Sequence, residues 1–341
     1  MGAYYSPPIA IFVVMKKLVC FCWCIFCVCR LLAQPSPPEL AQMMASARWY
    51  MQAGNYSEAT RVYRQALLLQ PGNMQVQMAL SEALYDAGNY DEAIGIVKPL
   101  VGKAGVPDTV SDILVRSQMA AGQRKAATET LDKALGRFPN SGMLWCDKGQ
   151  LLQARKRPDE ALEAWQTGIK RAPGYARNYY YAALAGMDKG QPAALAYGEI
   201  YLLHTRDNDT VLLPKMLAGY TTMFANIGGN TSKSYVSKLD DSLSKIFTLL
   251  TPVVSDGVGV ETLTMARVRF VLEWKQVYST PLPQPYRYLQ SMIADGYFDI
   301  WNEWLFGVAE SPTAHRAWLN FHKEDMGRLE TYFKTHPYIA E

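Results

Sequence analysis

The feature that most constrains the fold is a pattern of residue types that recurs every 34 residues between residues 40 and 209. Its units begin at Leu40, Met74, Asp108, Gly142 and Ala176. Position 15 of successive units reads Gly54, Gly88, Gly122, Lys156 and Gly190, and position 20 reads Ala59, Ala93, Ala127, Ala161 and Leu195. A fixed period of this length predicts a stack of similar supersecondary units.

The residue types at the other fixed positions suit two antiparallel helices in each unit. Large apolar side chains stand at position 24 (Tyr63, Val97, Leu131 and Trp165), and proline or glycine stands at position 32 (Pro71, Gly105, Pro139 and Pro173). We expect the small residues, including Gly149 at position 8, to let the helices approach, with large side chains filling the space. Glycine at position 15 permits a left-handed bend between the helices. Proline at position 32 ends the second helix.

Two segments of the chain repeat almost letter for letter. Residues 53–59 read AGNYSEA and residues 87–93 read AGNYDEA. In this pattern residues 40–209 resemble the tetratricopeptide repeat (TPR) family, with a degenerate fifth unit that has Ala183 where the family usually has glycine. The resemblance implies an all-α fold, a right-handed superhelical solenoid of helix pairs. It also implies that the first helix of each pair lines a concave face that binds another protein.

Positions 2, 5, 9 and 12 of each first helix are expected on that concave face. The candidate partner-binding residues at these positions are Met44, Arg48, Met51, Met78, Glu82, Tyr85, Asp112, Arg116, Met119, Met143, Gln150 and Tyr180. Methionine adapts its shape, so this face could accept an apolar or amphipathic peptide. The alternative is that several of these methionines pack against the neighbouring helix pair, and the sequence leaves both readings open.

One mode of binding is disfavoured by the first unit. Repeat domains of this family that clamp the carboxylates of a chaperone's C-terminus have lysine and asparagine at positions 5 and 9. Here those positions are occupied by Met44 and Arg48. We therefore do not expect a carboxylate clamp.

Residues 1–33 have the composition of a secretory signal. Lys16 and Lys17 precede an apolar stretch of signal-peptide length over residues 18–29, and Ala33 precedes a proline-rich linker at residues 34–39. We expect export, with Met15 as an alternative start and cleavage after Ala33. Lipidation of Cys29, which would make a lipoprotein, is a second reading. The short Lys-Lys signal suggests a bacterial periplasm or the periplasmic face of an outer membrane, and membrane association through a partner or an uncleaved signal stays open.

The charge balance argues against nucleic acid as a partner. Residues 1–33 contain three basic residues and no acid, so the remainder of the chain carries 31 basic and 31 acidic residues and is neutral. A neutral body gives no electrostatic reason to bind a nucleic acid or an anionic membrane surface. Five of the six cysteines lie between residues 20 and 29 among apolar residues, which favours an apolar segment over a metal site.

Residues 210–341 lose the repeat register but still have helical periodicity. Helices are expected over residues 210–227, 232–250, 261–278, 285–294, 298–306 and 312–335. We interpret this part as a helical domain that caps the open end of the solenoid, as repeat arrays require. Its dense aromatic residues are expected to form the core, and an exposed docking patch made of Trp301, Trp304 and Trp318 is the alternative.

The sequence contains no recognisable catalytic motif. A phosphate-binding loop, a Gly-x-Ser-x-Gly elbow and a His-Glu-x-x-His helix are all missing. His315 and His322 are seven residues apart and share one helix face, whereas metal-binding helices usually space ligands four apart. We therefore expect a non-enzymatic scaffold that binds another protein without a cofactor or metal. The alternative function is an enzymatic or carbohydrate-binding role for residues 210–341, with the repeats serving to recruit it.

Overall fold

The protein is described here from a computed structural model. The model describes residues 38–206, 209–226, 238–255, 257–278 and 281–339. The expected signal at residues 1–33 and most of the linker at 34–39 lie outside these residues. Within the described ranges the secondary structure is entirely helical, as predicted. No helix in these ranges combines the length and the apolar character needed to span a bilayer.

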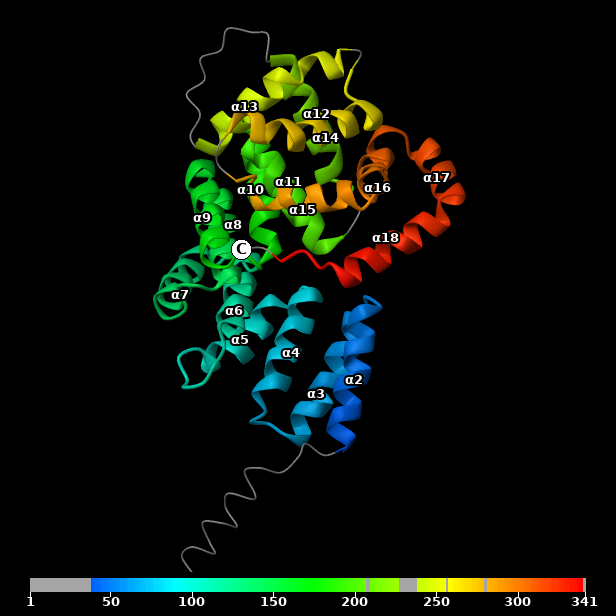
Figure 1. Ribbon diagram of the computed structural model, residues 1–341. Coiled ribbons are helices and arrows are strands. Elements are labelled where there is room, and N and C mark those ends of the chain that lie inside the picture. The colour runs from blue at the N-terminus through cyan, green and yellow to red at the C-terminus, as the bar shows by residue number, and fades with distance from the viewer. Residues whose placement is uncertain (1–37, 207–208, 227–237, 256, 279–280, 340–341) are drawn as a thin grey trace, which may run out of the picture. The chain divides into compact units, whose positions relative to one another are not determined.

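Residues 38–205 fold into five consecutive helix pairs (Figure 1). The pairs are α2 (Pro38–Gln52) with α3 (Tyr56–Leu69), α4 (Met74–Asp86) with α5 (Tyr90–Val97), α6 (Asp108–Ala120) with α7 (Arg124–Arg137), α8 (Gly142–Ala154) with α9 (Pro158–Arg171), and α10 (Ala176–Asp188) with α11 (Ala193–Thr205). The first helices of the last four pairs begin at the residues that the 34-residue register predicts. Each of the ten helices therefore corresponds to half of a predicted unit.

The bend within each pair is made by one residue in the left-handed backbone region. The residues at position 15 have φ angles of 71° (Gly54), 80° (Gly88), 74° (Gly122), 59° (Lys156) and 65° (Gly190). Glycine adopts this conformation without the steric cost that a Cβ atom imposes. Lys156 shows that the position keeps its conformation even where the sequence lacks glycine.

The chain divides into two compact units, residues 1–97 and residues 98–341. The first unit contains α2–α5 and is built around small alanines and larger side chains that fill the space between them. Its main buried cluster includes Ala47, Ala59, Tyr63, Leu80, Leu84 and Ala93. Asn55 and Asn73 cap the first turns of α3 and α4, because their side chains accept hydrogen bonds from backbone N–H groups three residues later.

The second unit begins with a short 3₁₀ helix, Lys98–Leu100, and contains α6–α18. Beyond the fifth pair its helices are α12 (Leu212–Asn226), α13 (Lys238–Leu249), a 3₁₀ turn (Thr251–Val254), α14 (Val260–Val277), α15 (Gln284–Ala294), α16 (Phe298–Glu310), α17 (Pro312–Phe321) and α18 (Lys323–Thr335). Helix α12 contacts both α10 and α11. The C-terminal helices therefore cover the last repeat pair, as the capping interpretation requires.

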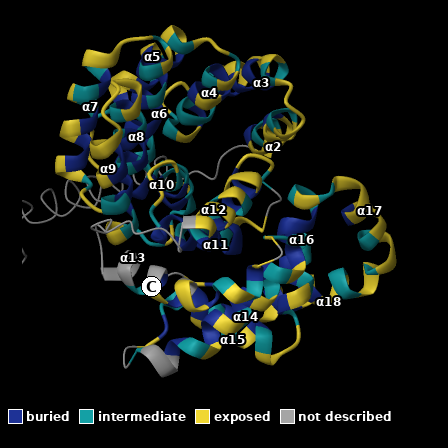
Figure 2. Cartoon of the chain, turned by 90° about the horizontal axis from the view of Figure 1, so that it is seen from above, coloured by how far each residue is buried: buried dark blue, intermediate teal, exposed yellow. Residues whose placement is uncertain are grey.

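One buried cluster runs from Tyr179 in α10 to Tyr338 near the C-terminus, so the fifth pair and the C-terminal helices share a core. Figure 2 shows the buried and exposed sides that alternate along these helices. The single helix expected over residues 312–335 was wrong. The chain breaks at His322, which has φ −108° and ψ 30° and separates α17 from α18 without a glycine or proline to mark the break.

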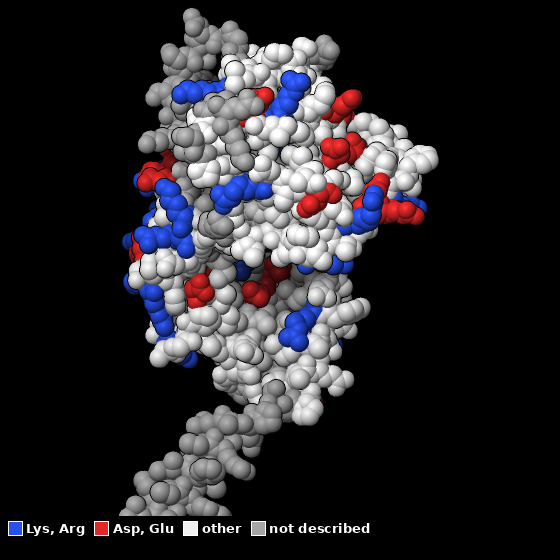
Figure 3. Space-filling model, in the orientation of Figure 1, with Lys and Arg blue, Asp and Glu red and all other residues white. Residues whose placement is uncertain are grey.

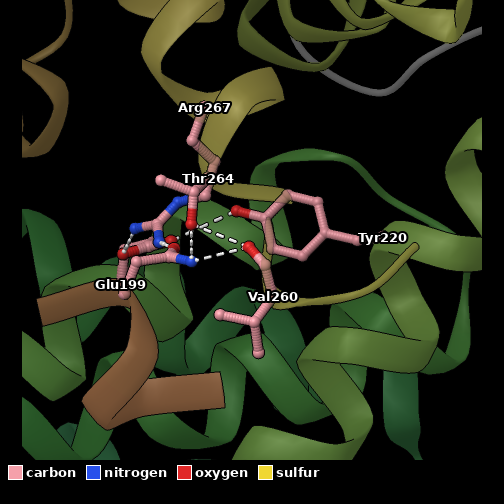
Figure 4. Close-up of polar contacts among 6 residues, drawn as sticks. Glu199, Tyr220, Val260, Thr264 and Arg267 are labelled. Atoms are coloured by element: carbon pink, nitrogen blue, oxygen red, sulfur yellow. Dashed lines mark hydrogen bonds and ion pairs between the residues drawn. The ribbon is translucent and has the colours of Figure 1, made fainter. Parts of the chain in front are cut away.

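A buried polar network connects four helices of this core (Figure 4). Arg267 of α14 donates to Glu199 of α11 at 2.6 Å, and Tyr220 of α12 donates to the same carboxylate at 3.2 Å. Arg267 also donates to Asn302 of α16, whose amide in turn donates to the Val260 carbonyl oxygen at 3.2 Å. The guanidinium lies over two aromatic rings of α16. The network fixes the mutual arrangement of these helices, because buried charges need their hydrogen-bond partners.

Candidate functional site

In the first compact unit the predicted face residues lie on α2 and α4 and are mostly half-buried. Met44 and Met51 contact the buried cluster of this unit while remaining partly exposed, and Met78 is also half-buried. Arg48 and Glu82 are exposed. Met44 and Met51 therefore pack on the core of this unit while part of each side chain stays accessible, and a role in binding a partner stays a prediction.

Two tyrosines of this unit lie close to the predicted face residues or belong to them. The pKa of the Tyr63 phenol is raised by burial, while Arg48 lowers it and Glu82 raises it. The Tyr85 ring lies 5.6 Å from the ring of Tyr90, measured between centroids. Aromatic pairs at this separation stabilise each other's orientation. This contact therefore helps to orient the Tyr85 ring.

In the second compact unit the predicted face contains an ion pair on α6. Arg116 donates from Nε to the Asp112 carboxylate at 3.0 Å, with a second guanidinium nitrogen 2.9 Å from the same oxygen. Asp112 is buried, whereas 22% of the Arg116 side chain remains accessible. Met119 contacts the core beside this pair, and Tyr180 of α10 contacts the core around the fifth helix pair. Met143 and Gln150 on α8 are half-buried.

A second carboxyl group, Asp147 of α8, was not among the predicted site residues. It is 2% exposed, and its Oδ2 has no hydrogen-bond partner among the described residues. Burial, and after it the negative charge of Asp112, hold the pKa of Asp147 well above its usual range. A hydrogen bond between the two carboxyl groups acts in the same direction. At this site two carboxyl groups therefore lie close together, and one of them is paired with Arg116.

The aligned repeats carry a signal that could have identified this pair. Position 6 is apolar in the first three units, as Ala45, Ala79 and Ile113, but is Asp147 in the fourth. Position 5 is methionine in the first two units and Asp112 in the third. An acidic residue at a position that is otherwise apolar indicates a local function or a specific buried contact.

The groups around the carboxyl pair are also shielded from water. Burial raises the pKa of the Cys146 thiol to about 12, so this cysteine stays protonated near neutral pH. Burial likewise raises the pKa of Tyr175. Such a thiol is a poor nucleophile, because the thiolate is the reactive form. The cluster is therefore suited to hydrogen bonding rather than to covalent chemistry.

Trp301, Trp304 and Trp318 do not form the single exposed patch that was the alternative prediction for the C-terminal region. Trp301 is fully buried, at 0% exposure, and stacks on Trp304 at 5.1 Å within the core. Trp318 alone of the three belongs to a surface groove, where it stands between His315 and His322 at centroid distances of 6.0 and 4.5 Å. Tryptophan periodicity does not distinguish the two cases, because core and surface aromatics share the same spacing.

His315 and His322, the two histidines considered as possible metal ligands, have carboxylate neighbours. His315 is buried, with Nδ1 3.5 Å from a Glu303 carboxylate oxygen, and His322 Nδ1 lies 2.7 Å from Asp325 Oδ2. Both rings stack on Trp318, although the two histidines do not lie within one helix, because α17 ends at Phe321. Among the residues that the structure describes, no three histidine, cysteine or acidic side chains gather as metal ligands would.

The Asp147 carboxyl gives a pH-dependent prediction. Because its folded-state pKa is raised, its contribution to stability is present below the unfolded pKa and is lost as pH rises through the folded value. Asp147→Asn keeps a hydrogen-bond donor toward Asp112 without the charge. We expect the free energy of unfolding of this variant to be about 1 kcal/mol higher than that of wild type near neutral pH. The difference should vanish in acid. Urea titrations at several pH values measure this, and an Asn variant that is less stable at neutral pH would contradict the assignment.

Comparison with known proteins identifies the repeats. Residues 50–107 and residues 114–176 each match a family model described as tetratricopeptide repeat. A TPR repeat-containing protein of Pseudomonas aeruginosa is 34% identical over 94 residues, which are 27% of this chain and 16% of that protein. The human protein O-mannosyl-transferase TMTC1 is 25% identical over 132 residues, which are 38% of this chain and 15% of that protein. The aligned region thus spans about a sixth of either relative.

Solved structures with partial similarity to this chain include the following three. A thermophilic TPR protein of Thermus thermophilus is 16% identical and covers 53% of this chain and 98% of its own, with a TM-score of 0.46. MamA is 22% identical, and the match covers 49% of this chain and 92% of MamA with a TM-score of 0.37. YrrB, described as a TPR protein with an unusual peptide-binding site, is 19% identical and covers 50% and 87%, with a TM-score of 0.34. The predicted repeat segment is confirmed by the two family matches within residues 50–176.

Proposed function

Because residues 50–176 carry tetratricopeptide repeats, we propose that this protein is an exported scaffold that holds another protein of a bacterial cell envelope. The repeats themselves support a protein-interaction scaffold. We propose in addition that the scaffold lies in the cell envelope, that its partner is an envelope protein, and that the repeat face is the contact surface.

The observation that carries the proposal is the mixed character of the face on α6, α8 and α10. Met119 lies on α6 with the Asp112–Arg116 pair, whereas Met143 and Gln150 lie on α8 and Tyr180 lies on α10. All four side chains are half-buried. Flexible apolar side chains adapt to a partner's shape, and a preformed ion pair supplies a directional polar contact. Such a face suits a peptide segment that has apolar side chains and one hydrogen-bonding group.

Export rests on the sequence of residues 1–33. A basic start, an apolar stretch and Ala33 before Pro35 form the three parts of a secretory signal. Expression of the full chain in a Gram-negative host, followed by fractionation and N-terminal sequencing, tests this. A mature chain that begins at Gln34 in the periplasmic fraction supports the proposal, and an intact chain in the cytoplasmic fraction would refute export.

The binding face is tested with variants chosen to leave the fold intact. Arg116 is unsuitable for charge reversal, because an acid there would add a third carboxyl group beside Asp112 and Asp147. We instead expect Met143→Lys with Gln150→Lys to reduce recovery of the partner from envelope fractions about tenfold, through lost apolar contact and a new charge. Mass spectrometry after affinity capture measures this.

A matched control changes charge on the second helices of the same pairs. Glu129 and Glu163 are exposed on α7 and α9, so Glu129→Lys with Glu163→Lys should leave recovery unchanged. Thermal unfolding of both double variants establishes that they fold. Equal recovery with the face variant and wild type would exclude this face, and failure to recover any specific protein would count against the scaffold.

A further inference from the structure

Helix α14 exposes an apolar stripe of three side chains. Met265 and Leu272 are 45% and 58% exposed, and Val268 lies half-buried between them. The spacing of three and four residues places all three side chains on one side of two helical turns. Large apolar side chains of a helix normally face a neighbour, so a row exposed in this way marks an interaction surface.

The stripe forms the floor of a groove with a volume of about 740 Å³. Ile300 of α16 and Trp318 of α17 add apolar walls, and His322 and Asp325 close the end beside α18. The Trp318 ring is held by its stacking on His315 and His322. The wall is therefore ordered before anything binds, which lowers the entropic cost of binding.

Carboxylates dominate the rim of this groove. Glu261, Asp299, Glu303 and Asp325 line it, against one arginine, Arg269, and His322. Hydrogen bonds from His322 and then Arg328 lower the pKa of Asp325, so it remains ionised. The body of the chain is neutral overall, so this excess is local. Figure 3 shows acidic side chains gathered over the region of α14, α16 and α17 on the face in view.

We propose that this groove binds a cationic amphipathic helix of a partner protein, at a second site distinct from the repeat face. The apolar side chains of that helix would lie along Met265, Val268 and Leu272 and against Trp318. Its lysine or arginine residues would meet the carboxylates of Glu261 and Asp299. A helix fits because the stripe extends over two turns, so that ridges of one helix can enter the grooves of the other.

The probe is a fluorescein-labelled synthetic helix of about 20 residues with leucine at positions i, i+3, i+4 and i+7 and lysine on the flanks. Fluorescence anisotropy measures its binding to the full chain. We expect Met265→Ser with Leu272→Ser, and separately Glu261→Gln with Asp299→Asn, to weaken binding about tenfold each. The second pair should also reduce the salt dependence of binding, because fewer charges then attract the peptide.

Matched controls distinguish binding in this groove from nonspecific hydrophobic binding of the peptide. Leu68 on α3 is 80% exposed, so Leu68→Ser removes an even more accessible leucine elsewhere and should leave binding unchanged. The same peptide with glutamate in place of lysine should bind at least tenfold more weakly. All substituted side chains are exposed, and unchanged thermal unfolding shows that the variants fold.

Three outcomes would overturn the proposal. The first is equal binding of the glutamate peptide, and the second is equal loss of binding with Leu68→Ser. The third is sedimentation showing a dimer that Met265→Ser with Leu272→Ser dissociates, since the groove would then belong to a second copy of the chain. Failure of the repeat-face experiment leaves these results unaffected, because the two sets of variants lie on different helices.

Discussion

Replacing Arg267 by methionine is expected to lower the free energy of unfolding by about 3–5 kcal/mol, because it leaves a buried carboxylate without its cation. Glu199 is 0% exposed and is paired with Arg267 at 2.6 Å. Methionine fills much of the volume of the arginine stem, so the loss reports the missing charge more than a cavity. Urea unfolding followed by circular dichroism measures it.

The pH dependence of this loss has a defined sign. Burial raises the pKa of Glu199, while Arg267 and Tyr220 lower it. Without Arg267 the folded-state pKa rises further above the unfolded value of about 4.3. A group whose folded pKa is raised loses its contribution to stability as pH increases through that value. The destabilisation should therefore be small in acid and largest near neutral pH.

The control is the double variant Glu199→Leu with Arg267→Met, which removes both charges. Replacing a buried pair by apolar residues of similar volume is often close to neutral, so the double variant should be markedly more stable than Arg267→Met alone. If both variants were equally unstable at every pH, the network would matter through packing and not through its charges.

The sequence predicted the repeats because their information is local and periodic. The bend at Lys156 illustrates this, since the register marked the position although the residue type did not. The Glu199–Arg267 pair joins residues 68 positions apart, and no short-range pattern indicates which charges of a chain will meet. The break at His322 was missed for a related reason, because no glycine or proline marks it. His322 occupies the N-cap position of α18, where its side chain contacts the Asp325 carboxylate and not a backbone N–H group.

The candidate site was predictable only in part. Position numbers placed Asp112 and Arg116 on one helix face, and their four-residue spacing allows the observed ion pair. Asp147 was missed because its burial depends on side chains of neighbouring helices, which its own local sequence does not indicate. Trp301 and Trp318 have the same residue type and similar surroundings in sequence, yet one is fully buried and the other lines a groove. Tertiary packing alone decides between them.

Gly149→Ala is expected to destabilise the protein by about 3 kcal/mol, although alanine is the better helix former. A Cβ atom at Gly149 would lie 2.1–2.5 Å from three atoms of the Trp165 indole. The Trp165 ring cannot shift without losing contacts. Its Nε1 donates to the Cys146 carbonyl oxygen at 3.2 Å, and the ring stacks on Tyr181 with 5.3 Å between centroids. Thermal and urea unfolding measure the loss.

Gly136→Ala in α7 is the matched control. Gly136 is exposed in the last turn of α7, and a Cβ atom there would meet nothing within 4 Å. This substitution should raise the free energy of unfolding by about 0.5–1 kcal/mol through helix propensity alone. Opposite signs for the same chemical change would separate the close approach of α8 and α9 from any general effect of alanine.

A second-site change tests the mechanism directly. Trp165→Leu alone should destabilise by about 3 kcal/mol, since it removes a large buried ring. Combined with Gly149→Ala, it should cost less than the sum of the two single changes, because the smaller side chain leaves room for the added methyl group. Strict additivity would contradict the close contact between positions 8 and 24. A coupling of 1 kcal/mol or more would instead show that the small residue at position 8 is required by the large residue at position 24 of the same unit. The recurrence of large residues at position 24 would then reflect a pairwise packing requirement between the two helices of a unit, which is the physical reason that this fold is visible in its sequence.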